Sequence, residues 1–252
     1  MSFHTLLIQF KNDLWNERIK FLILLILFIF QAFSSIISIF YMEEILALFN
    51  IKYISPIAPT GEAAFLDYFN DQFLFGILIM SLGTMNIYAA EIENNSISYS
   101  LTRPISRTKY TVARFVARIT ALILPFIVAT FIGWIYMLVF FELFSLDRLL
   151  LSLSVLVLLF IYLGTITSAL STRLSALTSG LGAIGLFVVQ FTISAFKPIE
   201  LLSPFSSTTL WSEFLLNISV PLNEIIFKLI LLGGWILIPF FLAIYSMKKR
   251  DL

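Results

Sequence analysis

The sequence contains no cysteine and a single histidine, His4, among its 252 residues. The absence of thiols excludes disulfides, cysteine nucleophiles and Cys-based metal sites, and one histidine excludes metal sites built on several imidazoles. Charged residues are also scarce, at 12% of the chain, whereas a soluble domain has about 25%. Because 60% of the residues are hydrophobic, this composition indicates a protein that lies in a lipid bilayer.

Six apolar runs of 18 to 23 residues make up about half of the chain. A bilayer core about 30 Å thick takes about 20 apolar residues per helix. The sequence therefore predicts an all-α membrane protein, with residues 1–252 as a single transmembrane domain. The six predicted spans cover approximately residues 21–40, 73–90, 119–141, 149–170, 176–196 and 225–247.

Positive charge is concentrated on one side of these predicted spans. Segments 1–20, 91–118, 171–175 and 248–252 carry 12 of the 16 Lys and Arg residues. The positive-inside rule therefore predicts that both termini are cytoplasmic. Lys228 is the one ionisable residue within the apolar runs, and we expect its long side chain to reach toward the nearer, outer membrane surface. Because no carboxylate falls within the runs, a proton-coupled carrier is disfavoured.

The segment before the first span has the pattern of an amphipathic helix. Phe3, Leu7, Phe10 and Leu14 recur at helical spacing, and Trp15 follows them. Such a helix lies in the membrane interface with its apolar face toward the lipid, and tryptophan is a typical interfacial anchor. The sequence predicts an interfacial helix over residues 1–20; the alternative is a polar lead-in to the first span.

No motif for catalysis or for nucleotide binding is present. Gly180, Gly182 and Gly185 match GxGxxG, but they fall inside a predicted span, where small residues favour close helix packing rather than dinucleotide binding. The P-loop pattern GxxxxGK[ST] is absent. We therefore expect no enzyme activity, no metal site, no bound cofactor and no nucleic-acid partner for this chain itself.

The loop between the second and third spans holds most of the turn signals. Ser96 can cap a short helix that ends before Pro104, because a residue that precedes proline is disfavoured in the α region. Ser106 can cap the next helix, which begins near Arg107 and continues into the third span. One interpretation is an ordinary basic loop on the inner side. The other is a short helix, bounded by turns, that contacts a cytoplasmic partner.

The residues of this loop resemble those in the membrane subunits of ABC-2 type transporters. In these subunits the loop carries two glutamates, a Gly-Thr pair, a leucine and a Pro-x-Ser-Arg run, followed by an aromatic and a basic residue. The matching residues here are Glu91, Glu93, Leu101, Pro104, Ile105, Ser106, Arg107, Tyr110 and Arg114. Two departures are Asn95-Ser96 in place of Gly-Thr and Arg114 in place of lysine. The layout of six spans with an interfacial N-terminal helix also fits.

This resemblance implies a permease that works with a separate cytoplasmic ABC ATPase, which would bind ATP and Mg²⁺. Two permease subunits, identical or different, would form the translocation path between them. The loop would supply a coupling helix that docks on the ATPase. The coupling residues carried over from the family are Glu91, Glu93, Asn95, Ser96, Leu101, Pro104 and Arg107.

The resemblance also gives the outer segment between spans five and six a role. In this family the segment forms short re-entrant helices beneath an outer gate; the alternative is an ordinary hydrophobic loop. The gate candidates are Pro204, Phe205, Trp211 and Phe214.

The sequence predicts the chemical class of the cargo less specifically than the resemblance predicts the transport mechanism. Spans rich in Phe, Leu, Ile, Ser and Thr suit a hydrophobic or amphipathic substrate better than a metal ion or a sugar chain. The family includes exporters of toxin and antimicrobial peptides, among them phenol-soluble-modulin exporters. The residue usage is typical of a low-GC bacterium, so we expect a peptide exporter in a bacterial cell membrane. Two alternatives stay open: a non-transporting membrane anchor or regulator with a cytoplasmic partner, and a secondary carrier.

Overall fold

The computed structural model describes residues 11, 15, 17–42, 44, 60–94, 106–142, 144–194, 196 and 203–249. Within these ranges every regular element is a helix, which confirms the predicted all-α class. Six helices are long and apolar enough to cross a membrane. They are α2 (Arg18–Phe40), α4 (Gly61–Thr84), α7 (Arg107–Tyr136), α8 (Leu146–Ser171), α9 (Ala176–Ser194) and α12 (Leu222–Lys249).

Shorter helices extend or connect these six. After a turn at residues 85–88, α4 continues into α5 (Ala89–Glu93), and α7 continues into η1 (Met137–Val139). Between α9 and α12 lie η2 (Pro204–Ser207) and α11 (Thr208–Leu215).

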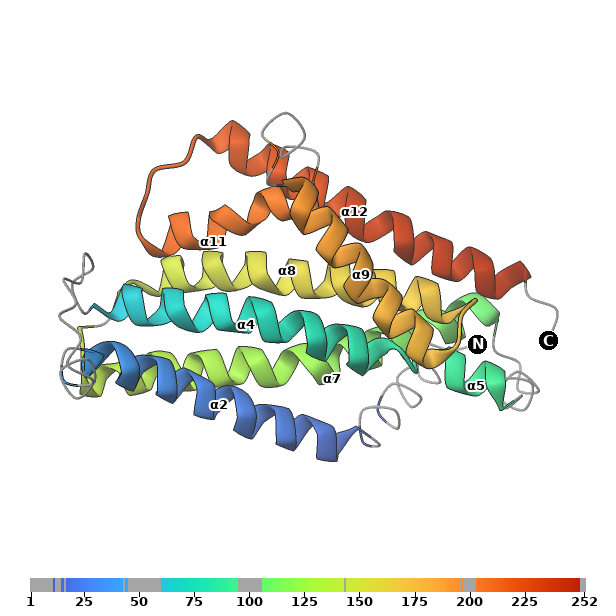
Figure 1. Cartoon of the computed structure of the whole chain (residues 1–252), viewed down its shortest axis with the longest axis horizontal. Helices are drawn as coiled ribbons and strands as arrows, with labels where there is room; N and C mark the ends of the chain where they lie inside the picture. Colours follow the sequence, from blue (N-terminus) through green and yellow to red (C-terminus); the bar gives the residue numbers. More distant parts are fainter. Residues whose placement is uncertain are drawn as a thin grey trace.

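Helix α8 lies at the centre of the bundle and packs against α4, α7, α9, α11 and α12. Helix α2 packs against α7 and α4, on the side of the bundle away from α9 and α12 (Figure 1). The starts of α2 and α7, α5 and the end of α12 lie at one end of the bundle (Figure 1). We call it the basic end, because Arg107, Arg114, Arg118 and Lys248 belong to these elements. The starts of α4, α8 and α12 lie at the opposite end.

Side-chain caps fix several helix starts, among them those of α7 and α4. Ser106 accepts a hydrogen bond from the Lys109 backbone N–H (3.4 Å), and α7 begins at the next residue, which confirms the predicted cap. Thr60 accepts one from the Ala63 N–H (3.2 Å) and caps α4. Such caps satisfy backbone donors that have no partner within the helix.

Helix α4 extends beyond the apolar run that it contains. The run begins at Phe73, but the helix begins 12 residues earlier, at Gly61. The added turns contain Glu62, Asp67 and Asp71. The apolar run has no carboxylate, as the sequence indicates, but the whole helix has three.

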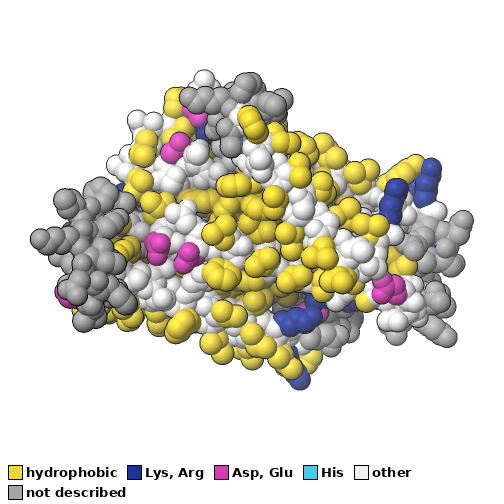
Figure 2. Space-filling view, in the orientation of Figure 1, with side chains coloured by type: hydrophobic (Ala, Val, Ile, Leu, Met, Phe, Trp, Pro, Cys, Tyr) yellow, Lys and Arg dark blue, Asp and Glu magenta, His cyan; other side chains and the backbone are white. Residues whose placement is uncertain are grey.

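Aromatic side chains fill the interior and aliphatic ones cover much of the outside. Phe126 has no exposed surface and packs edge-on against Phe160 of α8 (ring centroids 5.3 Å apart) and Phe28 of α2 (5.7 Å). Large apolar residues such as Ile26, Phe30 and Leu177 are more than half exposed, and hydrophobic side chains cover the middle of the face in Figure 2. An apolar surface of this extent suits contact with lipid and not with water.

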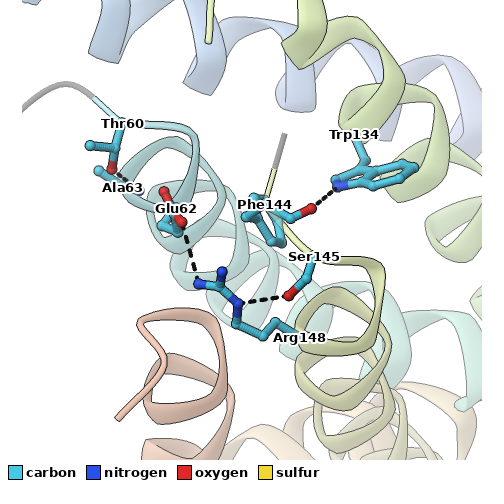
Figure 3. A network of polar contacts seen from close by, with 7 residues as sticks. All are labelled: Thr60, Glu62, Ala63, Trp134, Phe144, Ser145 and Arg148. Atoms are coloured by element: carbon cyan, nitrogen blue, oxygen red, sulfur yellow. Dashed lines mark hydrogen bonds and ion pairs between the residues drawn. The ribbon is translucent and has the colours of Figure 1, made fainter. Parts of the chain in front are cut away.

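An ion pair at the opposite end joins α4 to α8. Arg148 Nη1 lies 3.4 Å from the Glu62 carboxylate, and Arg148 Nε donates to Ser145 (2.8 Å), as Figure 3 shows. In the same view Trp134 of α7 donates its indole N–H to the Phe144 carbonyl (3.3 Å). These contacts fix the chain between α7 and α8.

Candidate functional site

The basic end holds the first candidate site, built around Glu91. Its carboxylate accepts hydrogen bonds from the Tyr110 hydroxyl and from the Arg114 guanidinium, both on α7. The Glu91 and Arg114 side chains are only 19% and 25% exposed, so the pair is shielded from solvent and is stronger than a surface ion pair. We call Glu91, Tyr110 and Arg114 the Glu91 clamp. It fixes α5 against the start of α7, on either side of residues 95–105.

Neighbouring contacts tie α7 to α2 and α12 at the same end. Arg118, one turn beyond Arg114, lies 2.5 Å from the Glu17 carboxylate at the start of α2. Arg107 donates to the Lys248 carbonyl at the end of α12 (3.4 Å). The buried Tyr88 hydroxyl donates to the Thr111 carbonyl (2.8 Å). A displacement of α5 would therefore be passed to α7 and from there to α2 and α12.

Only part of the predicted coupling region falls in the described ranges. Glu91 and Glu93 lie on α5, and Arg107 is the first residue of α7. Asn95, Ser96, Leu101 and Pro104 lie outside the described residues, so their predicted roles stay predictions. The predicted site omitted Tyr110 and Arg114, although both belong to the loop pattern that carried the resemblance.

The same limit applies to the predicted interfacial anchor. Phe3, Leu7, Phe10 and Leu14 lie outside the described residues. Trp15 is described and is 64% exposed. The Arg18 guanidinium lies 4.6 Å from the centre of its ring.

The opposite end holds the second candidate site, in η2 and α11. Pro204 and Phe205 are buried in η2, Trp211 is 4% exposed in α11, and Phe214 is half-buried. Ser152 of α8 donates to the Trp211 carbonyl (2.9 Å), which anchors α11 to the central helix. The two short helices pack against α8, α4 and α9.

Phe205 lies in a cluster of rings from five helices, which includes Tyr162 of α8 (ring centroids 6.0 Å apart). Its ring centroid lies 5.0 Å from Phe187 of α9 and 6.1 Å from Phe73 of α4, and Phe73 lies 5.1 Å from Trp211. Sequence reasoning found Phe205 and Trp211 but missed Phe73 and Phe187. The signal for α9 was weak: Phe187 and Phe191 are four residues apart and so share one helix face.

Lys228 is held by partners within the protein. Its ammonium lies 2.8 Å from the Glu224 carboxylate and donates to the Thr209 hydroxyl of α11 (3.1 Å), while only 6% of the residue is exposed. Glu224 lies one turn nearer the start of α12, so the side chain is directed toward the opposite end. The charge is neutralised by Glu224 and does not depend on water at the membrane surface.

The glycines of the GxGxxG match lie within α9, as the packing interpretation requires. A Cβ at Gly180 would lie 3.2 Å from Met85, next to the end of α4, whereas Gly185 has no neighbour within 4 Å. Close packing thus explains Gly180 but not Gly185.

Six helices of spanning length and a helical interior define a multi-pass membrane protein. The family model described as ABC-2 family transporter protein matches residues 19–252. The chain therefore belongs to the ABC-2 transporter family, and the resemblance seen in the loop is confirmed. It is a membrane permease component of an ABC transporter, a class of subunit that is generally not catalytic. A search of curated protein sequences found no match.

Proposed function

We propose that this chain is the permease subunit of an ATP-driven exporter in a bacterial cell membrane. A separate cytoplasmic ABC ATPase binds ATP and Mg²⁺ and docks on the loop between α5 and α7. The observation that carries this proposal is the Glu91 clamp, because it fixes both ends of that loop to the bundle. A rigid attachment of this kind can transmit a displacement of the loop to the spanning helices.

Charge distribution supports the orientation. The basic end carries most of the lysines and arginines of the chain, so by the positive-inside rule it faces the cytoplasm. Both termini are then cytoplasmic, and the loop at residues 95–105 lies on the side where ATP is available. The η2–α11 pair lies at the outer side, where it acts as re-entrant gate helices.

The proposed cargo is a hydrophobic or amphipathic molecule, with a peptide favoured. Two permease subunits, identical or different, form the path for it. Aromatic and aliphatic side chains cover much of the outer surface of the bundle, and such surfaces suit an apolar body better than a sugar chain or a metal ion. Residues 1–20 contribute an interfacial helix that holds the basic end at the inner leaflet.

The test is recovery of the ATPase with the tagged permease from its native membranes. The wild-type chain should recover a nucleotide-binding protein and stimulate its ATP hydrolysis. Glu91→Ala should lower both several-fold, because it releases α5 from α7. Glu62→Ala is the matched control: Glu62 has a similar exposure and a single Arg partner, but lies at the opposite end. Failure to recover any nucleotide-binding protein would overturn the proposal.

A secondary carrier is the second candidate, because Asp67 and Asp71 lie in a spanning helix, where ion-coupled carriers place carboxylates. Flux driven by an ion gradient, in vesicles without ATP, would favour it. The family membership favours the ABC mechanism, which requires flux that stops when ATP is withdrawn.

A further inference from the structure

Two carboxylates of α4 lie in a segment that is long and apolar enough to cross a membrane. This segment runs from Gly61 to Glu93 and contains Asp67 and Asp71. They are four residues apart and share one helix face, and both are partly exposed. Figure 2 shows acidic side chains over this half of α4, next to the hydrophobic surface.

Neither carboxylate has a basic partner among the residues that the structure describes. The Ser35 hydroxyl of α2 lies near Asp67, and the nearby charge is that of Asp71. Other acids of the spanning helices are neutralised: Glu62 by Arg148 and Glu224 by Lys228. An unpaired charge at membrane depth is costly and typically marks a substrate or ion path.

A buried amide adds a second, independent observation. Gln72 has no exposed surface; its Nε2 donates to Gln31 of α2 (2.6 Å), and its Oε1 has no hydrogen-bond partner. Gln31, Ser35, Asp67, Asp71 and Gln72 thus form one polar group between α2 and α4, which we call the α2–α4 seam. Carboxylates and the amide oxygen only accept hydrogen bonds. The seam therefore carries two carboxylates and an unpaired amide oxygen, and none of the described salt bridges brings a cation to it.

We propose that the α2–α4 seam binds the ammonium or guanidinium group of an amphipathic peptide cargo. The inference rests on the proposed export function and narrows the cargo from amphipathic to cationic amphipathic. A cation supplies charge-assisted hydrogen bonds to these oxygens and the positive charge that the seam lacks. A metal ion fits less well, because the described residues contain no group of three or more His, Cys, Asp or Glu side chains.

The test is peptide binding to the purified chain in phosphatidylcholine nanodiscs, with binding to empty discs subtracted. The probes are a fluorescent amphipathic helical peptide with several lysines and the same peptide with every lysine acetylated, which removes the charge. The lysine peptide should bind more tightly to the wild-type chain. Asp67→Asn and Asp71→Asn should each weaken it about tenfold, the effect of one lost charged hydrogen bond, without changing binding of the acetylated peptide.

Glu62→Gln is the matched control, since Glu62 lies on the same helix but is paired with Arg148; it should bind both peptides as the wild type does. The Asn variants should be as stable as the wild type or more so, because they remove unpaired charge. Equal wild-type affinity for both peptides, no binding of the lysine peptide, or wild-type affinity in both Asn variants would overturn the inference. If ATPase recovery then persists, the export proposal stands and only the cargo class is wrong.

Discussion

The Glu91 carboxylate on α5 is bound by the Arg114 guanidinium on α7, 23 positions later in the chain. Because residues 95–105 lie between these partners, the pair closes the loop at its base. A charged pair shielded on both sides depends on its geometry, and removal of one partner leaves the other charge uncompensated.

The first prediction concerns this pair. Glu91→Arg and Arg114→Glu should each lower the free energy of unfolding by about 1–3 kcal/mol and abolish stimulation of the ATPase. The double swap should restore part of both, since opposite charges face each other again. SDS titration in mixed micelles and ATP hydrolysis would measure the two effects.

The control for this cycle is the Glu62–Arg148 pair at the opposite end, whose side chains are similarly exposed. The corresponding single and double charge swaps at Glu62 and Arg148 should change the free energy of unfolding but leave the stimulation of the ATPase intact. Equal loss of stimulation in both cycles would contradict a specific role of the Glu91 clamp in coupling.

The second prediction concerns the start of α7. Ser106→Ala should lower the free energy of unfolding by about 0.5–2 kcal/mol, because the Lys109 N–H loses its acceptor. Ser106→Asn should retain most of the wild-type free energy of unfolding, since asparagine caps as well as serine. Ser145→Ala is a useful comparison: Ser145 precedes α8 but makes no side-chain cap bond. It accepts only an exposed hydrogen bond from the Arg148 side chain, so its effect should be smaller. A larger loss at Ser145 would argue against the cap.

The starts of α7 and α4 show what the sequence can and cannot predict. Ser106 was recognised because a polar, turn-rich loop precedes it. Thr60 caps α4 in the same way, but the residues that follow include Glu62, Asp67 and Asp71, and a hydropathy pattern assigns such residues to a loop. The full length of α4 can be recognised only when the Thr60 cap is considered together with the packing of α4 against α2.

Contacts between distant helices are harder still to predict. The Phe205 cluster joins α4, α8, α9, η2 and α11 through rings such as Phe73 and Phe187. Each of these residues lies in or beside an apolar run, and nothing local distinguishes a ring that faces lipid from one that faces a neighbouring helix. Only the family resemblance indicated Phe205 and Trp211.

The third prediction concerns this aromatic cluster as a gate. Phe205→Ala should lower the free energy of unfolding by about 3–5 kcal/mol, because a fully packed ring is removed. In vesicles without ATP it should also raise leakage of a small dye. Vesicles with the Phe205→Leu variant should leak less dye than vesicles with Phe205→Ala. Phe241→Ala, which removes an exposed ring from α12, should do neither. Destabilisation without leakage would show that the cluster packs the bundle but does not close the path.

The last prediction concerns the side on which the basic end lies. The natural chain has no cysteine, so a single introduced thiol can be labelled without background. Lys249→Cys, at the exposed end of α12, should react with a membrane-impermeant maleimide only after cells are permeabilised. Glu142→Cys, between α7 and α8 at the opposite end, should react in intact cells. The reverse pattern would place the loop between α5 and α7 outside, away from ATP, and would contradict the coupling proposal. Both variants replace exposed side chains, so neither should disturb the fold.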